Sequence, residues 1–213
     1  MRHFYNLIVV AQFLAFGVSE TRAQNQNLAG FVFANAIGVS AKADVAANGK
    51  KLTRNGIEAG MATSGLGLPL GNYQMQVSAA GCETATSPLT IAAGATPVVV
   101  AYLERKFDPQ TRTIKNFVRL LQLPSEPQES KYLIKVISVD ADANFTATAS
   151  GQTQTLQNFK PAVFEAKSIR ITDSAGGTEE PKVSDKGSYY CFAFRKADGK
   201  PGTSLVLQRI YQW

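Results

Sequence analysis

The chain has 213 residues, a length that suits one or two ordinary domains. Of these residues 45% are hydrophobic and 18% are charged, and the formal net charge is +6. Its 22 Lys and Arg residues are scattered and form no cluster longer than a pair, such as Lys50-Lys51. A nucleic-acid binder usually concentrates its basic residues on one element. We therefore expect a mildly basic, solvated surface and no nucleic-acid partner.

Residues 1–23 have the three-part layout of a secretory signal peptide. A short basic start is followed by an apolar run from Leu7 to Val18 and by a polar stretch that ends at Ala23. The run is shorter than the roughly 20 residues that a membrane helix needs, although a retained membrane anchor is the alternative. We expect cleavage after Ala23, an extracytoplasmic location (periplasmic, cell-surface or secreted), and no membrane-spanning segment in the processed protein.

The remaining chain reads as two copies of one unit. Residues 28–35 and 132–139 open the copies as apolar strands, and each copy continues to a short strand that ends in a turn. These turns, Asn48-Gly49 and Ser150-Gly151, are hairpin signals because glycine adopts a positive φ without steric cost. We expect a first unit over 24–124, a linker over 125–130 and a second unit over 131–213.

Further along each copy the pattern stays that of β-strands. Residues 72–79 alternate apolar and polar side chains with period two, which predicts a half-buried strand. Each copy closes with a predicted hairpin: 94–103 returns through the charged turn 104–112 into 117–123, and 187–194 returns into 205–211.

Short strands with Gly-rich turns and no amphipathic helical window predict an all-β protein of two tandem Ig-like β-sandwiches. Asp185-Lys-Gly-Ser-Tyr-Tyr-Cys191 fits the D-x-G-x-Y-x-C pattern, in which a tyrosine hydrogen-bonds back into the preceding loop. The partner cysteine and the core tryptophan of an antibody domain are missing, since the only Trp is the terminal Trp213.

Three segments of the first copy carry a resemblance to a known family. They are Ala43-Asp-Val-Ala-Ala-Asn-Gly49, Leu68-Pro-Leu-Gly-Asn-Tyr-Gln-Met-Gln-Val77 and Leu89-Thr-Ile-Ala-Ala-Gly-Ala-Thr-Pro-Val98. Residues 30–103 resemble a family of bacterial secreted Ig-like domains of unknown function, and Gly187-Ser-Tyr189 is the clearest remnant in the second copy. The resemblance implies a secreted repeat protein. It implies no activity, because the function of that family is unknown.

The residues give little support for catalysis. Processing removes His3, the only histidine, which excludes Ser-His-Asp and Cys-His catalysis and histidine metal sites. Asp140-Ala-Asp-Ala-Asn144 begins like a calcium loop, but Phe145 and Gly151 stand where Gly and Glu are needed, so we expect a polar turn; a weak cation site is the alternative. We expect no catalytic, cofactor-binding or metal-binding residues.

A carboxylate pair is the remaining catalytic candidate. Glu179 and Glu180, with Asp173 and Asp185 near in sequence, could do glycosidic acid/base work, although adjacent acids in a Gly-flanked loop usually keep it solvated. The two cysteines are 109 positions apart, as their numbers show. We expect Cys191 to be buried and Cys82 to be more exposed, both as free thiols; a disulfide is the alternative in an exported protein.

The sequence thus predicts an exported, non-enzymatic binding or structural module of the cell envelope, with an unidentified protein or polysaccharide partner. One alternative is a His-independent glycan-active enzyme. Another is a small outer-membrane β-barrel, which the alternating, aromatic ending Arg209-Ile-Tyr-Gln-Trp213 would suit.

Overall fold

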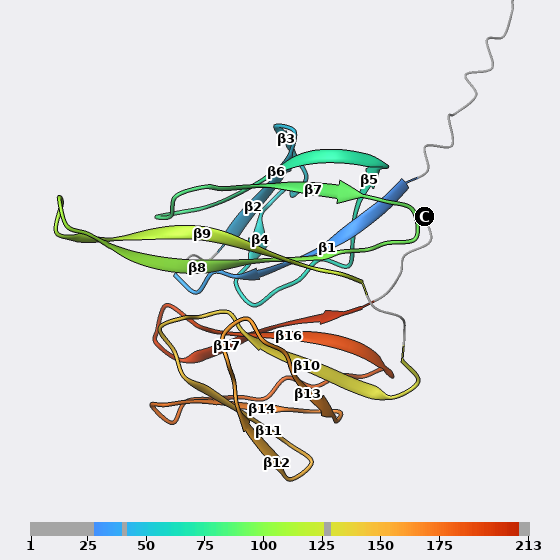
Figure 1. Ribbon diagram of the computed structural model, residues 1–213, viewed down its shortest axis with the longest axis vertical. Coiled ribbons are helices and arrows are strands. Elements are labelled where there is room, and N and C mark those ends of the chain that lie inside the picture. Colours follow the sequence, from blue (N-terminus) through green and yellow to red (C-terminus); the bar gives the residue numbers. More distant parts are fainter. Residues whose placement is uncertain (1–27, 40–41, 126–128, 209–213) are drawn as a thin grey trace, which may run out of the picture.

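The computed structural model describes residues 28–39, 42–125 and 129–208. The expected signal peptide, the centre of the expected linker and Trp213 lie outside the described residues. Within them all regular elements are β-strands, seventeen in number (Figure 1). The predicted all-β fold class is therefore confirmed.

The N-terminal half contains two sheets. One has the strand order β5-β1-β8-β9. Its strands are β1 (Leu28–Ala36), β5 (Leu66–Pro69), β8 (Val98–Asp108) and β9 (Thr113–Leu123). The other has the order β3-β2-β6-β7, with β4 also paired to β2. Its strands are β2 (Lys42–Ala47), β3 (Lys50–Lys51), β4 (Ile57–Glu58), β6 (Gly71–Ala79) and β7 (Ala85–Ile91).

The C-terminal half also contains two sheets, of orders β13-β10-β16-β17 and β12-β11-β14-β15. The strands of the first are β10 (Tyr132–Ser138), β13 (Ala162–Glu165), β16 (Gly187–Arg195) and β17 (Pro201–Leu207). Those of the second are β11 (Phe145–Ala149), β12 (Gln152–Thr155), β14 (Arg170–Asp173) and β15 (Thr178–Glu179).

The two halves repeat one topology. β1 pairs antiparallel with β5 and parallel with β8, and β10 pairs antiparallel with β13 and parallel with β16. In an immunoglobulin constant domain the first two strands share a sheet, whereas here β1 and β2 lie in different sheets, as do β10 and β11. The immunoglobulin-like arrangement expected from the sequence is therefore not confirmed. The D-x-G-x-Y-x-C pattern describes a local corner, and it does not determine which strand edges pair.

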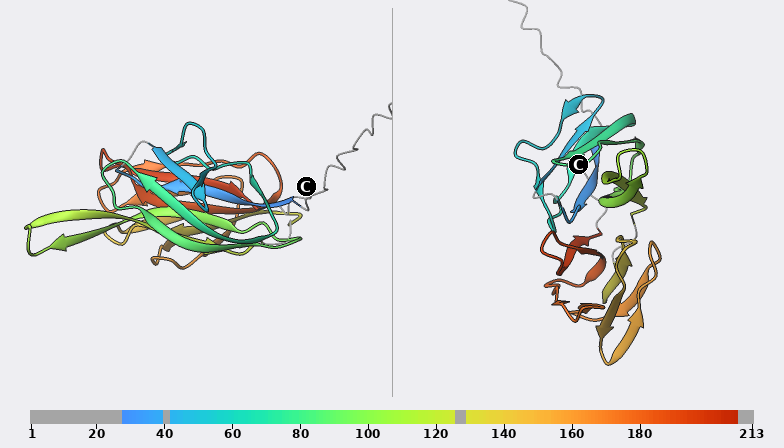
Figure 2. Two further views of the ribbon diagram at one scale, coloured as in Figure 1. Left: turned by 90° about the horizontal axis from the view of Figure 1, so that it is seen from above. Right: turned by 90° about the vertical axis from the view of Figure 1, so that its left-hand side faces the viewer.

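Hydrophobic packing stacks the four sheets in layers (Figure 1, and Figure 2, right). One core lies between the two N-terminal sheets and includes Phe31, Phe33 and Met75. A second lies between the two C-terminal sheets and includes Phe145 and Cys191. Each half therefore has the arrangement of a β-sandwich, with its own buried interior.

A third buried cluster, here called the shared core, joins the halves. Its buried members come from both inner sheets: Val32, Ala34, Ala36, Val98, Val100, Ile137, Val139, Tyr190, Phe192, Phe194 and Val206. Because of it, β1 and β16 are buried on both faces. This explains why their sequences read as continuous apolar runs rather than alternating ones.

The halves also approach closely at backbone level. A Cβ atom added to Gly38 would lie only 1.6 Å from the carbonyl oxygen of Arg195, so no larger residue fits there without movement. The Ser204 hydroxyl donates to the carbonyl oxygen of Met61 at 3.3 Å. The rings of Tyr102 and Phe159 lie 5.1 Å apart between centroids.

Two tyrosine corners hold strand entries in place. The Tyr189 hydroxyl donates to the carbonyl oxygen of Asp185 at 2.8 Å, which confirms the hydrogen bond expected from the D-x-G-x-Y-x-C pattern. Tyr73 makes the same contact with Pro69, also at 2.8 Å.

In both corners the residue two positions before the tyrosine is a glycine. Its φ is 155° at Gly187 and 150° at Gly71, a region of backbone conformation that residues with a Cβ rarely adopt.

Candidate functional site

The acidic candidates are each engaged in a separate contact. Glu179 accepts a hydrogen bond from the Lys196 ammonium at 3.1 Å, whereas Glu180 pairs with Arg170 at 3.5 Å. Each carboxylate is thus paired with a different cation. Asp173 is buried and accepts the backbone N–H groups of the turn that follows it, from residues 175 and 177. Its role is to stabilise that turn.

The predicted calcium-like loop uses its first carboxylate within the fold. Asp140 accepts the backbone N–H of Asp142 through Oδ1 at 3.0 Å and that of Arg195 through Oδ2 at 3.1 Å. The second contact ties this loop to the end of β16. Among the described residues no group of three or more His, Cys, Asp or Glu is placed to hold a metal ion.

Both cysteines are free thiols in the structure. Cys191 is fully buried in the second core, as predicted, and burial raises its thiol pKa to about 12, with a smaller contribution from the charge of Glu179. Cys82 is half-buried against the first core, and burial raises its pKa as well. A high thiol pKa disfavours the reactive thiolate, so neither side chain has the environment of a catalytic nucleophile.

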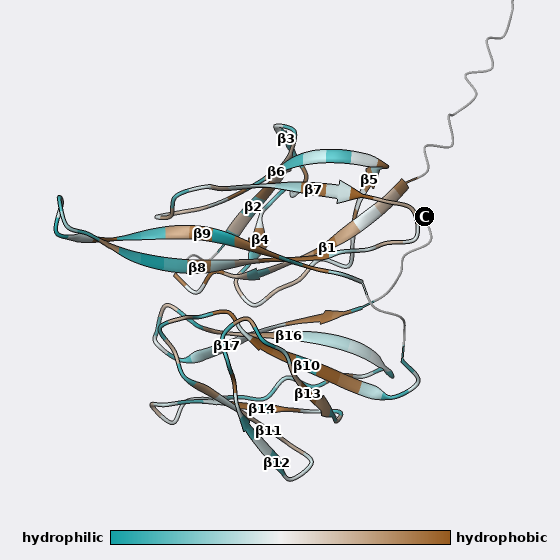
Figure 3. Cartoon of the chain, viewed as in Figure 1, coloured by the Kyte–Doolittle hydropathy of each residue, from teal (hydrophilic) through white to brown (hydrophobic). Residues whose placement is uncertain are grey.

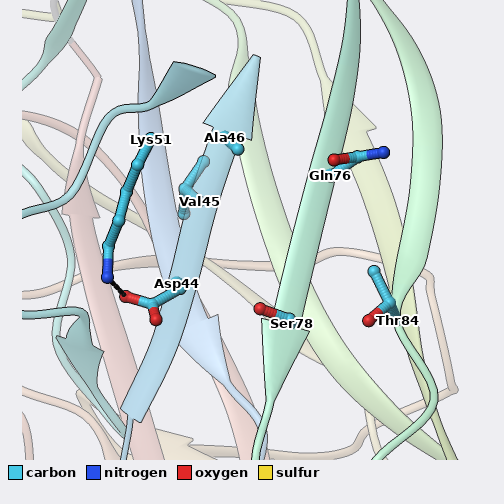
Figure 4. Close-up of a pocket in the computed structure, with 7 residues that line it drawn as sticks. All are labelled: Asp44, Val45, Ala46, Lys51, Gln76, Ser78 and Thr84. Atoms are coloured by element: carbon cyan, nitrogen blue, oxygen red, sulfur yellow. Dashed lines mark ion pairs between the residues drawn. The ribbon is translucent and has the colours of Figure 1, made fainter. Parts of the chain in front are cut away.

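A shallow hollow of about 320 Å³ lies on the outer face of the sheet that contains β2 and β6 (Figure 4). Its lining includes Gln76, Ser78 and Thr84. Its two charged groups satisfy each other, because Lys51 pairs with Asp44 at 2.9 Å. No unpaired charge is therefore left in it to bind a ligand.

The most distinctive surface feature is the hairpin of β8 and β9. The two strands pair without interruption from Val98↔Leu123 to Asp108↔Thr113, and their outer ends project beyond the sandwich (Figure 1, and Figure 2, left). The corresponding hairpin of the second half, β16 and β17, pairs over a shorter length and ends at Arg195↔Pro201. The projection is thus specific to the first half.

The turn between β6 and β7 supports this hairpin up to its middle. The Glu83 N–H donates to the Asn116 carbonyl oxygen at 2.8 Å, and the Val118 N–H donates to the Glu83 carbonyl oxygen at 3.0 Å. Beyond Asn116 three cross-strand pairs continue toward the turn, the middle one being Phe107↔Ile114. They extend past the supporting turn.

Phe107 and Ile114 form what we call the apolar tip. Each is 65% exposed, and they lie directly opposite each other across the two strands. By strand alternation they share a face with Leu103 and Val118, which contact the first core. The apolar tip therefore lies on the face of β8 and β9 that is turned toward the core. It lies beyond the end of the facing sheet, which contains β6 and β7, and so no other strand of the described chain covers it.

The other face of the projecting segment carries a charge network around Phe117. Glu104 binds Arg119 at 2.6 Å and Lys106 at 3.3 Å, and both cations lie over the Phe117 ring, at 5.4 and 6.0 Å from its centroid. The hydrogen bond from Arg119, with a further one from Lys106, lowers the pKa of Glu104. In Figure 3 the projecting part of β8 is largely hydrophilic.

The turn itself is held by Asp108. Its carboxylate pairs with Lys115 at 2.7 Å and accepts the backbone N–H groups of Gln110 at 2.9 Å and Thr111 at 3.4 Å. The Lys115 hydrogen bond, followed by these backbone bonds, lowers the pKa of Asp108 to about 2. The hairpin thus presents the apolar tip on a backbone whose turn is fixed by side-chain contacts.

The sequence had indicated only a charged turn over 104–112. A signal was nevertheless present, because Phe107 and Ile114 interrupt a run of the sequence that is rich in charged residues. In the structure both strands of the hairpin are 11 residues long, about twice the usual strand length. An exposed apolar pair in such a segment is more informative than an exposed apolar residue elsewhere.

Comparison with known proteins places the chain in no group: no family model matches it, and no curated protein matches it at a significant level. The resemblance of residues 30–103 to secreted bacterial repeats therefore rests on the segments quoted above. In the described ranges, no helix is long and apolar enough to cross a membrane.

Proposed function

We propose that the protein is an exported module of the cell envelope that acts by binding or by structural contact rather than by catalysis. The observation that supports this most directly is the projecting hairpin, whose apolar tip pairs the two most exposed large apolar side chains of the described residues, Phe107 and Ile114, directly across its strands. Contact surfaces of binding proteins commonly lie on such elements, which a rigid scaffold positions.

The site chemistry gives less support to a glycan-active enzyme. Such an enzyme needs two carboxyl groups facing each other across a substrate. Glu179 and Glu180 are bound instead to separate cations, Lys196 and Arg170. We therefore keep the binding or structural role as the proposal, with the export step as part of it.

Two measurements test the proposal. Intact mass of the protein purified from the producing cells should correspond to a chain that begins at Gln24; a mass that retains residues 1–23 would contradict export by cleavage. A broad hydrolase screen on glycans and esters should give no turnover. Turnover that disappears when Glu179→Gln and Glu180→Gln are combined would establish an enzyme and overturn the proposal.

A further inference from the structure

We infer that the apolar tip docks the protein onto an anionic lipid bilayer surface. This inference rests on the proposed binding function and names the partner of its most exposed element.

The charge of the hairpin complements an anionic surface. Between Glu104 and Arg119 five cationic side chains stand against two carboxylates, Glu104 and Asp108. The cations are Arg105, Lys106, Arg112, Lys115 and Arg119.

The two carboxylates are occupied by Lys106, Lys115 and Arg119. Within the described part of the chain, Arg105 and Arg112 form no ion pair. By strand alternation Arg105 lies on the same face as Phe107, two cross-strand pairs closer to the sandwich. An unpaired cation therefore flanks the apolar tip on its own face.

The backbone of the projecting segment is suited to a partly dehydrated environment. Its strands pair with each other up to Asp108↔Thr113. In the turn, the N–H groups of Gln110 and Thr111 donate to the Asp108 carboxylate, and Pro109 has no N–H. Unpaired backbone groups are costly at a lipid surface, and this hairpin presents few of them.

The area of the apolar tip favours a lipid surface over a protein partner. A whole aromatic side chain presents about 150–250 Å². Two side chains that are each 65% exposed therefore offer far less than the roughly 800 Å² per partner of a stable protein interface. Membrane docking does not need that area, because shallow apolar insertion and the attraction of several cations to anionic lipids act together.

Co-sedimentation of the processed protein with lipid vesicles tests the inference. We expect binding to vesicles of phosphatidylcholine mixed with phosphatidylglycerol, weakened by added salt, and much less binding to phosphatidylcholine alone. Combining Phe107→Ser with Ile114→Ser should lower the partition coefficient about tenfold or more. Arg105→Gln and Arg112→Gln, which leave the apolar tip intact, should each lower it about fivefold.

A matched control replaces two apolar residues that are exposed elsewhere, Met61 at 58% and Val163 at 47%. The combination of Met61→Ser with Val163→Ser should leave vesicle binding unchanged. Circular dichroism on every variant separates loss of binding from loss of folding. Absence of binding to the anionic vesicles, or binding that the tip and arginine variants leave unchanged, overturns the inference.

A photoreactive phenylalanine analogue at position 107 separates this inference from the proposed function. In intact envelopes, cross-links to lipid support membrane docking. Cross-links to a protein or a glycan in place of lipid overturn it but leave the binding function standing. If the analogue captures nothing and vesicles are not bound, both proposals fail.

Discussion

The contact between Gly38 and Arg195 gives a sharp test of how closely the two halves pack. An alanine Cβ at position 38 would lie 1.6 Å from the Arg195 carbonyl oxygen and 2.8 Å from its carbonyl carbon. Non-bonded heavy atoms need roughly 3.5 Å, so the two backbones must separate by about 2 Å. That movement would strain the contact of Arg195 N–H with Asp140, 3.1 Å in length, and the packing of the neighbouring Phe194 in the shared core.

We expect Gly38→Ala to lower the free energy of unfolding by about 3 kcal/mol, the upper part of the range for overpacking. Guanidinium unfolding followed by circular dichroism should show a lower midpoint with an unchanged slope. Gly49→Ala is the control: its φ is 77° and nothing lies within 4 Å of the added Cβ, so it measures backbone strain alone, about 1 kcal/mol. If Gly38→Ala lowers the free energy of unfolding no more than this control does, the close approach to Arg195 does not explain why position 38 is a glycine.

Phe192→Ala removes a fully buried ring from the shared core and should lower the free energy of unfolding by about 3–5 kcal/mol. Far- and near-UV circular dichroism should still show a single unfolding transition, whereas two separate transitions would mean that the halves unfold independently. Thiol titration should show slow reaction of Cys82 in the native protein and reaction of Cys191 only after denaturation, whereas a native Cys191 that reacts at once would contradict its burial. Because the pKa of Asp108 is depressed from 3.8 to about 2, its contacts should support the hairpin above about pH 4 and be lost as the pH falls toward 2. Carboxyl NMR titration should find this low pKa, and Lys115→Met should raise it toward 3.8; an unchanged pKa would refute the assigned cause.

Local patterns predicted the parts of the fold that depend on neighbouring residues. The alternation in 72–79 predicted β6, whose Met75 and Val77 are buried while Gln74 and Gln76 are exposed. The Asn48-Gly49 turn joins β2 to β3 with positive φ at Gly49, as its sequence indicated, and φ is also positive at Asn48. Such features could be read from the sequence because a two-residue turn and a period-two strand are determined within a few residues.

The candidate site was predicted only in part. The burial of Cys191 followed from its apolar neighbours on both sides, and the structure confirms it. Glu179 and Glu180 could be singled out as candidate acids, but their separate cations could not be foreseen. Arg170 comes close because β14 pairs with β15, and Lys196 comes close from the loop that follows β16 in the other sheet. A sequence identifies ionisable groups, whereas their partners depend on the tertiary fold.

The sequence by itself determined the all-β class, the two copies and the position of most turns, because these follow from local periodicity and glycine conformation. The tertiary structure alone decided that β1 lies parallel to β8 and in a different sheet from β2. It also decided that β1 and β16 bury both faces in a core common to the two halves. Finally, Phe107 and Ile114 remain exposed because the opposite sheet ends before their hairpin does, and that length difference is a relation between strands far apart in the chain.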